Sequence, residues 1–224
     1  AGISLKLLAE GAQKLEAQLT AELSQGSASF PKIFSLPIQN IKGQINLRKN
    51  VLSLQNVTGT INQIPLGVNG QINLNAVEPH LQMKASFARF DLGLIPQGMP
   101  NFKNLNLKGN ARAQIDITGP VSVLAINGQF ENAVGSLYEI PFSELQGKFS
   151  LFKEDFDLEI SQMIFAKGTG NVVLKMNLKN PDPTVVVNGK LNNAHIEELI
   201  RVPQFLGEMN LKVEGTGTLS NLPL

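Results

Sequence analysis

The stretch NLNLKGNARAQIDIT, residues 104–118, decides the fold class because its side chains alternate in character at every step. Its odd-numbered residues, from Leu105 to Ile117, are Leu, Gly, Ala or Ile, and its even-numbered residues, from Asn104 to Thr118, are all polar or charged. Successive side chains of a β-strand point to opposite faces of the sheet, whereas a helix repeats after about 3.6 residues. The stretch therefore predicts a β-strand with one apolar and one polar face.

The same alternation recurs along most of the chain. It continues in EMNLKVEGTGTLS, residues 208–220, and in runs that begin at Leu66, Leu81, Leu145, Phe156, Gly168 and Val185. Short polar segments, RKN at 48–50 and KED at 153–155, separate neighbouring runs, and NAVEP at 75–79 and KNPDP at 179–183 place proline where a strand must stop. Short connections join antiparallel neighbours, so from residue 38 onward the sequence predicts a mainly β antiparallel meander.

The N-terminal segment ISLKLLAEGAQKLEAQLTAELSQG, residues 3–26, fits two periods. Leu15, Leu19 and Leu23 have helical spacing, whereas the alternation that includes Ala17 and Ala21 fits a strand. We favour a strand hairpin that turns through Gly11 over a helix. Residues 1–35 are therefore expected to continue the sheet as a hairpin, with a helix as the alternative.

Two strand entries in this chain are alike. LPIQNIKGQINL, residues 36–47, and IPFSELQGKFSL, residues 140–151, lie 104 residues apart, with Pro37 matching Pro141 and Gly43 matching Gly147. Proline and glycine impose backbone constraints, so these matches weigh more than matches between Leu or Val. The repeat predicts two sheet units, 36–139 and 140–224, within one continuous domain.

Each unit is predicted to contain one short helix. ASFARFDLGLIPQGMPNF at 85–102 and GKLNNAHIEELIRVPQFL at 189–206 each end a strand and continue in an apolar cluster that is followed by proline. Asp91 and His195 stand where a side chain could cap such a helix. Each unit is thus expected to comprise several strands, a short helix and a final strand pair.

Composition excludes several classes of function. The 19 Lys and Arg residues nearly balance the 18 Asp and Glu residues and form no basic cluster, which argues against a nucleic-acid partner. The absence of cysteine excludes disulfides, thiolate metal sites and cysteine nucleophiles. No apolar run approaches the ~20 residues of a membrane-spanning helix, and the first residues lack a signal-peptide pattern. We expect the chain as given to be soluble, with any anchor outside it.

Each motif that could carry catalysis has a simpler structural interpretation. His80 and His195 lie far apart in the sequence, and the repeat places Thr184 and Asp91 at the corresponding positions, so neither imidazole is required by the unit. EDFDLE at 154–159 alternates carboxylates with apolar residues, which indicates a solvated strand face rather than a calcium site or an acid–base pair.

Two glycine motifs resemble phosphate loops only superficially. GTGN at 168–171 and GTGT at 215–218 lack the following helix and the GK[ST] ending of such loops, so their glycines are expected to allow sheet bending or to leave room on the apolar face. We therefore expect no enzyme activity, no cofactor and no metal.

A resemblance to a known family rests on three segments: IPFSELQGKFSLFKEDFDLEISQMIFAKGTGNVVLKMNL at 140–178, PTVVVNGKLNNAHIEELI at 183–200 and LKVEGTGTLS at 211–220. Their succession of glycine-rich amphipathic strands and a strand that leads into a brief helix resembles the AsmA/TamB superfamily over about residues 36–224. The resemblance implies a long, bent antiparallel sheet that forms an open hydrophobic, β-taco-like groove.

The resemblance also implies a location and a partner. Members are membrane-anchored proteins of the Gram-negative envelope, linked to phospholipid transport between the inner and outer membranes or to outer-membrane assembly. This chain would then be a periplasmic segment of a longer protein whose inner-membrane anchor lies elsewhere, with phospholipid or another acyl-chain lipid as its ligand. Outer-membrane proteins or assembly factors are the other partners that the resemblance implies.

A sheet with one apolar face must hide that face, either against a second sheet as a closed β-sandwich or against helices or a ligand. The chain offers little helix to cover this face, and the residues alone favour the closed sandwich. The resemblance implies an open groove, which is therefore the prediction, with the sandwich as the alternative. The candidate groove-lining residues are Ile45, Leu47, Leu54, Val68, Ile72, Leu74, Leu81, Met83, Leu105, Leu107, Ile115, Ile117, Phe149, Leu151, Leu158, Val172, Leu174, Met176, Val185, Val187, Leu211, Val213 and Leu219.

Two functions follow from these residues. The first is a lipid-handling module in which acyl chains lie along the apolar face, because burial of each methylene contributes about 0.8 kcal/mol without fixing one pose. The second is a structural or chaperone-like interaction module whose sheet edges and groove receive a strand of a partner.

Overall fold

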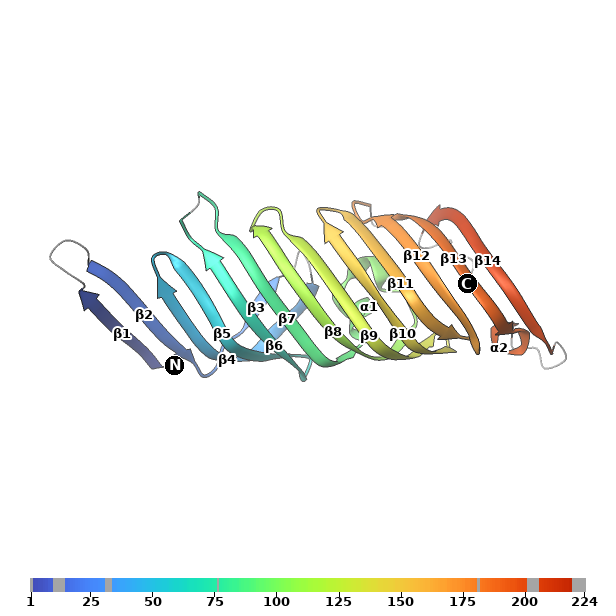
Figure 1. Cartoon of the computed structure of the whole chain (residues 1–224), viewed down its shortest axis with the longest axis horizontal. Coiled ribbons are helices and arrows are strands. Elements are labelled where there is room, and N and C mark those ends of the chain that lie inside the picture. Colours follow the sequence, from blue (N-terminus) through green and yellow to red (C-terminus); the bar gives the residue numbers. More distant parts are fainter. Residues whose placement is uncertain are drawn as a thin grey trace. The chain divides into compact units, whose positions relative to one another are not determined.

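The computed structural model describes residues 2–9, 15–30, 34–75, 77–180, 182–200 and 206–218 (Figure 1). The strands are β1 (Gly2–Ala9), β2 (Leu15–Leu23), β3 (Ala28–Phe30), β4 (Phe34–Arg48), β5 (Val51–Ile61), β6 (Ile64–Asn73), β7 (His80–Asp91), β8 (Leu107–Pro120), β9 (Ala125–Leu137), β10 (Ile140–Phe152), β11 (Asp155–Phe165), β12 (Gly168–Asn177), β13 (Thr184–His195) and β14 (Glu208–Thr218). The helices are α1 (Leu94–Gly98), the 3-10 turn η1 (Pro100–Phe102) and α2 (Ile196–Ile200).

The strands form one antiparallel sheet. The hydrogen-bonded order is β1-β2-β4-β5-β6-β7-β8-β9-β10-β11-β12-β13-β14, and β3 pairs with β4 away from this path. Apart from β2 and β4, which flank β3 in the sequence, neighbours in the sheet are consecutive in the sequence, and in the described part of the chain β14 does not pair with β1. The predicted fold class, a mainly β chain in one long, open antiparallel sheet with few short helices, is confirmed. The alternative of two sheets closed into a sandwich is wrong.

The chain divides into two compact units. Unit 1 comprises residues 1–88 and 114–126, and unit 2 comprises residues 89–113 and 127–224. The boundaries of these units do not follow the sequence repeat, because β8 and β9 are each divided between the two units. The sequence boundaries at 36 and 140 describe where the pattern restarts, and they stay a prediction about domain organisation.

The sequence repeat has a counterpart in the backbone. The bounds of β5, β6 and β7 recur 104 residues later as the bounds of β11, β12 and β13. The turn Asn62–Gln63, with φ of 48° and 70°, recurs as Ala166–Lys167, with φ of 49° and 61°. Positive φ at both central residues is the geometry of a type I′ turn, which matches the twist of the flanking strands. The two turns therefore have the same backbone geometry although their residues differ.

Strands β4 and β10 are interrupted at corresponding places. The pairing of β4 with β5 shifts register between Gln39 and Gln44, and that of β10 with β11 shifts between Ser143 and Gly147. A bulge of this kind bends its strand and increases the local twist. Each of these two strands is therefore expected to bend locally at its bulge.

The N-terminal segment is a pair of strands. β1 and β2 pair antiparallel, from Gly2 opposite Glu22 to Ala9 opposite Leu15. This confirms the strand interpretation of the segment over the helical one. Gly11, the predicted turn, lies outside the described residues.

The predicted cap of the first helix is wrong. The residue before α1 is Gly93, which provides no side-chain cap, and the Asp91 carboxylate accepts a hydrogen bond of 2.8 Å from the Gly93 amide instead. This i to i+2 contact is an Asx turn, which ends β7 before the helix begins. His195 directly precedes α2, and its side chain contacts the Glu197 carboxylate in the first turn of that helix. A capping role of His195 stays a prediction.

The polar face of the sheet carries exposed ion pairs, as the alternation predicts. In unit 2, Lys148 Nζ lies 2.9 Å from Glu159, and Arg112 lies 3.1 Å from Glu131. Both pairs join strands and stay well exposed, so each contributes little to stability. The carboxylates of the EDFDLE segment that were predicted to face solvent do so: Asp155 and Asp157 are exposed, and Glu159 is partly exposed within its ion pair.

Candidate functional site

The apolar face of unit 2 is built from four rows of side chains that run across β10–β14. Each row joins residues that are directly opposite one another in the strand registers. The rows are Leu151, Phe156, Met176, Val185 and Gly217; Phe149, Leu158, Leu174, Val187 and Gly215; Gly147, Ile160, Val172, Gly189 and Val213; and Met163, Gly170, Leu191 and Leu211. Every residue in these rows is apolar or glycine. We call this surface the apolar face and number its rows in this order.

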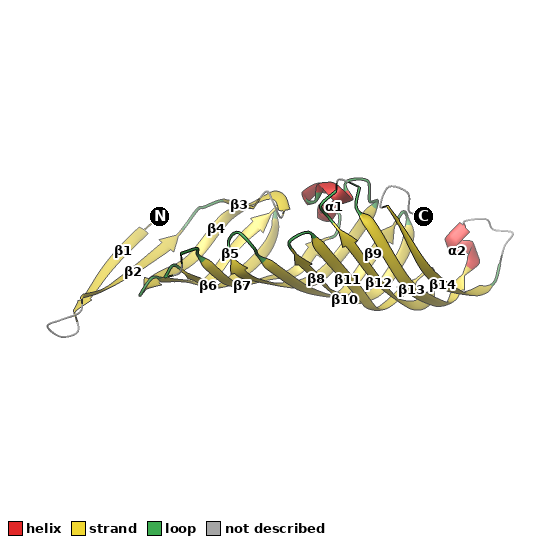
Figure 2. Cartoon of the chain, turned by 90° about the horizontal axis from the view of Figure 1, so that it is seen from above, coloured by secondary structure: helices red, strands yellow, loops and turns green. Residues whose placement is uncertain are grey.

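The α1–η1 segment, residues 94–102, covers the first row. Phe102 forms a buried cluster with Met176 and Val185, and Ile95 and Met99 pack against that cluster. This segment follows β7 along the chain, yet it reaches the strands β11–β13, further along the sheet order. Figure 2 shows α1 beside the strands of unit 2 and outside the sheet itself.

The second helix covers the opposite end of the strands. Leu199 of α2 packs against the buried cluster of Met163, Leu191 and Ala194, which includes the fourth row. β13 runs directly into α2, so the helix lies at the end where β13 finishes, whereas Val185 of the first row lies near the start of β13. The two short helical segments therefore cover opposite ends of the same strands.

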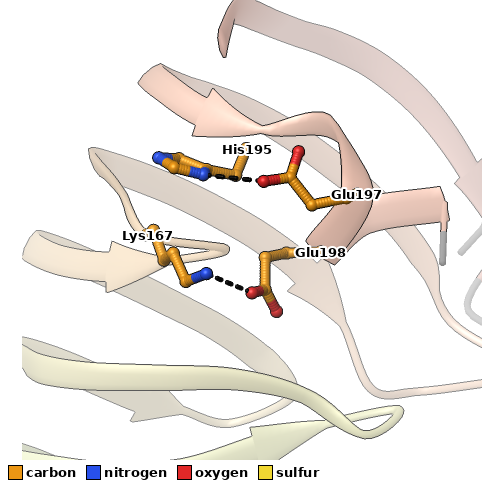
Figure 3. A network of polar contacts seen from close by, with 4 residues as sticks. All are labelled: Lys167, His195, Glu197 and Glu198. Carbon is orange, nitrogen blue, oxygen red and sulfur yellow. Dashed lines mark hydrogen bonds and ion pairs between the residues drawn. The ribbon is translucent and has the colours of Figure 1, made fainter. Parts of the chain in front are cut away.

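Polar contacts attach α2 to the turn between β11 and β12 (Figure 3). His195 Nδ1 lies 2.9 Å from Glu197 Oε1, and Lys167 Nζ lies 2.6 Å from Glu198 Oε1. The pKa of Glu197 is held below its ordinary value by its own backbone amide, by His195 and by the Gly207 amide, against a smaller opposing effect of desolvation. The pKa of Lys167 is raised by its hydrogen bond and charge interaction with Glu198.

Within β10–β13, the second and third rows form the central strip, which we define as Phe149, Leu158, Leu174, Val187, Gly147, Ile160, Val172 and Gly189. Its six side chains are half-buried, between the two covered ends. The Phe149 ring stacks on Phe156 with centroids 6.2 Å apart. It also lies over Gly128, where an added Cβ would stand 2.1 Å from the ring. Aromatic rings and aliphatic side chains thus present one continuous apolar surface.

The glycines of the two GTG motifs have different surroundings. A Cβ at Gly168 or Gly170 would lie within 2.6 Å or 2.3 Å of a carbonyl oxygen of β13, so close strand approach explains both. At Gly215 and Gly217 of β14 an added Cβ would meet nothing within 4 Å. Space on the apolar face is therefore found at the second motif only.

Unit 1 carries its own apolar rows. Leu47, Leu52, Ile72 and Leu81 are opposite one another across β4–β7, and Ile45, Leu54, Gly70 and Met83 form the adjacent row. Leu81 is buried, and the other side chains of these rows are half-buried. Six of the candidates predicted for the first repeat, Ile45, Leu47, Leu54, Ile72, Leu81 and Met83, thus share a face within unit 1.

The structure places the predicted groove residues as follows. Buried are Leu81, Met176 and Val185; half-buried are Ile45, Leu47, Leu54, Val68, Ile72, Met83, Leu105, Leu107, Ile115, Ile117, Phe149, Leu151, Leu158, Val172, Leu174, Val187 and Leu211. Leu74 and Val213 are exposed, at 43% and 50%. Leu219 lies outside the described residues. Their role as ligand contacts stays a prediction.

Sequence reasoning missed the side chains that cover this face. Phe102, Ile95 and Met99 were recognised as part of a short helical cluster, but not as partners of β11–β13. The signal was present in the apolar character of residues 94–102, which a solvent-exposed connection would not need. Their distance in the sequence from Met176 and Val185 hid the contact.

The described residues contain no grouping of three or more His, Cys, Asp or Glu side chains that could hold a metal ion. Within the same ranges, no helix combines the length and the apolar character needed to cross a bilayer.

Comparison with known proteins gave no match: no protein-family model, curated protein or solved structure is significantly similar to this chain.

Proposed function

We propose that this chain binds the acyl chains of phospholipid along its apolar face and holds them for transfer within a Gram-negative envelope. The observation that carries the proposal is the central strip, in which strand registers align apolar side chains without a polar group. Such a surface offers contact to a hydrocarbon chain but no hydrogen bond that would fix its pose. The function is binding and conduction, without catalysis or cofactor.

Hydrophobic burial provides enough free energy for such a complex. Each methylene removed from water contributes about 0.8 kcal/mol, so ten buried methylenes would contribute on the order of 8 kcal/mol before ordering costs. The contact is non-directional, because neither a methylene nor a Leu or Val side chain has a preferred partner atom. A bound chain can therefore slide along the strip.

The periplasmic location and the link to transport between the inner and outer membranes rest on the sequence resemblance described above. The charged pairs of the opposite face, such as Lys148 with Glu159, suit contact with water. The protein would accordingly bury the tails of a lipid on one face of its sheet while the other face stays solvated.

Two adjacent valines of β13 provide a matched test. Val187 lies in the central strip, whereas Val186 is 47% exposed on the opposite face, across from Lys175. We expect Val187→Asp to reduce capture of a photoreactive acyl-chain phosphatidylglycerol by at least about tenfold, because a carboxylate in the strip must be desolvated. Val186→Asp should capture as much as the wild type. Equal capture by a folded Val187→Asp variant would reject the proposal.

A second candidate function is strand addition at β14, and one observation favours it. β14 is the last strand in the sheet order, and its Gly215 and Gly217 leave space around the backbone. An unpaired strand edge is a template for a partner strand. A protein that purifies without lipid and binds unfolded outer-membrane β-strand peptides through β14 would favour this function over the first.

A further inference from the structure

The α1–η1 segment takes up apolar surface that the proposed ligand would also contact. Phe102 meets Phe156 with ring centroids 6.0 Å apart, and Phe102, Met176 and Val185 are all buried. Leu174 and Val187, which belong to the central strip, pack against the same cluster. The segment therefore covers the first row of the apolar face and contacts side chains of the second row, which belongs to the central strip. A bound acyl chain would compete with the segment for these two rows.

Apolar contacts attach the segment to β11–β13. Its helix has five residues, no side-chain cap, no acidic residue in its first turn and no basic residue in its last turn. An exposed hydrogen bond of 3.1 Å, from Asn101 Nδ2 to the Asn180 carbonyl oxygen, joins the segment to the connection between β12 and β13. A helix this short has little stability of its own, so its place depends on the surface beneath it.

The equivalent helix in the other half of the repeat is attached differently. α2 has Glu197 and Glu198 in its first turn, and both carboxylates are engaged by side chains at the end of β13 and in the β11–β12 turn. Contacts of this kind require defined partner atoms. The contacts of α1–η1 are of the same non-directional kind as those of a hydrocarbon chain, so a hydrocarbon chain can replace them.

We propose that the α1–η1 segment is a displaceable cover that occupies the first row in the empty protein and moves aside when an acyl chain enters. This inference rests on the proposed function, because the competing ligand is the acyl chain. In this exchange the side chains of Met176, Val185 and Phe156 stay in an apolar environment before and after the acyl chain enters. The segment thereby couples ligand entry to opening at one end of the strands.

A reversible lock tests the cover. The chain contains no cysteine, so Asn101→Cys and Asn180→Cys introduce two thiols at the site of the exposed hydrogen bond, where a cleavable bismaleimide can join them. We expect the locked protein to capture at least about tenfold less photoreactive phosphatidylglycerol from vesicles than the unlocked protein, and to regain this capture when the linker is cleaved. The double variant without linker is the control.

The outcomes separate the two proposals. If locked and unlocked proteins capture lipid equally, the cover does not move and this inference is overturned, while the proposed function stands. If neither protein nor the wild type captures lipid, the proposed function fails, and the inference fails with it.

A second measurement reports on the cover directly. Met176, which is 6% exposed, is replaced by cysteine and its rate of maleimide labelling is measured with and without phosphatidylglycerol vesicles. Val186→Cys on the exposed face is the matched control. Displacement of the cover is expected to change the labelling rate of the Met176 position by at least about threefold while Val186 stays constant. An unchanged rate at both positions, in a protein that captures lipid, overturns the inference.

Discussion

The ring of Phe102 meets the ring of Phe156 edge-on, with centroids 6.0 Å apart and an interplanar angle of 64°. This contact joins the short η1 turn, which precedes β8, to a strand in the middle of unit 2. It explains how a chain with so little helix covers part of its apolar face. Side chains of the α1–η1 segment cover the first row, as a second sheet would in a β-sandwich.

Phe102→Ala is therefore expected to destabilise the protein by about 3 kcal/mol, because it removes a buried ring and leaves a cavity above Met176 and Val185. Chemical denaturation of the purified chain measures this change. Phe152, which is 49% exposed and near the Lys153 ammonium group, is the matched control: Phe152→Ala should cost less than about 1 kcal/mol. Similar losses from the two variants would show that Phe102 is not a core residue.

Two glycine-to-alanine variants are expected to have different effects on the free energy of unfolding. A Cβ at Gly128 would stand 2.1 Å from the Phe149 ring, whereas a Cβ at Gly215 would meet nothing within 4 Å. We expect Gly128→Ala to destabilise by about 1–3 kcal/mol through overpacking, and Gly215→Ala to be neutral or stabilising by up to about 1 kcal/mol. Thermal unfolding compares them. A neutral Gly128→Ala would mean that Phe149 does not rest on β9.

The sequence was sufficient for the fold class because strand periodicity is a local property. The alternation at 104–118 specifies which face of β8 is apolar, and the short turns specify which strands pair. The alternation also restricts the register, since Ile45 can be opposite Leu54 only if both lie on the apolar side. These features depend on neighbours in the chain, so one sequence carries them.

The contacts across the apolar face could not be predicted in the same way. Phe102 and Val185 are separated by most of the length of a repeat, and the local sequence pattern around either residue does not indicate that they are in contact. The cap prediction at Asp91 failed for another reason. Its side chain accepts a hydrogen bond from the Gly93 amide before α1 begins, a local contact that the pattern of apolar residues does not indicate.

The attachment of α2 should depend on pH at the two extremes. The folded pKa of Glu197 lies below its ordinary value of 4.5, so its contribution is fully present above pH 4.5 and is lost as the pH falls through the lowered folded value. The folded pKa of Lys167 lies above 10.5, so its contribution is present below pH 10.5 and is lost as the pH rises through the raised value.

The methyl resonances of Leu199 and Met163, which pack together in one cluster, report on this attachment by NMR. In the wild type they should shift in acid, and Glu197→Gln should reduce that shift while it leaves the alkaline one. An acid shift that is unchanged in Glu197→Gln would contradict the assignment to Glu197.

Hydrogen exchange should separate β12 from β14. Residues 168–177 of β12 are paired on both sides, with β11 and β13, whereas β14 pairs with β13 alone among the described strands. Amides of β12 are therefore expected to exchange at least about tenfold more slowly than the amides of β14 that point away from β13. Exchange measured at two protein concentrations gives the control. If the outward amides of β14 are as slow as those of β12 at both concentrations, the edge is covered within the chain itself, and strand addition at β14 is excluded; protection that rises with concentration would instead identify a second copy as the strand that pairs there.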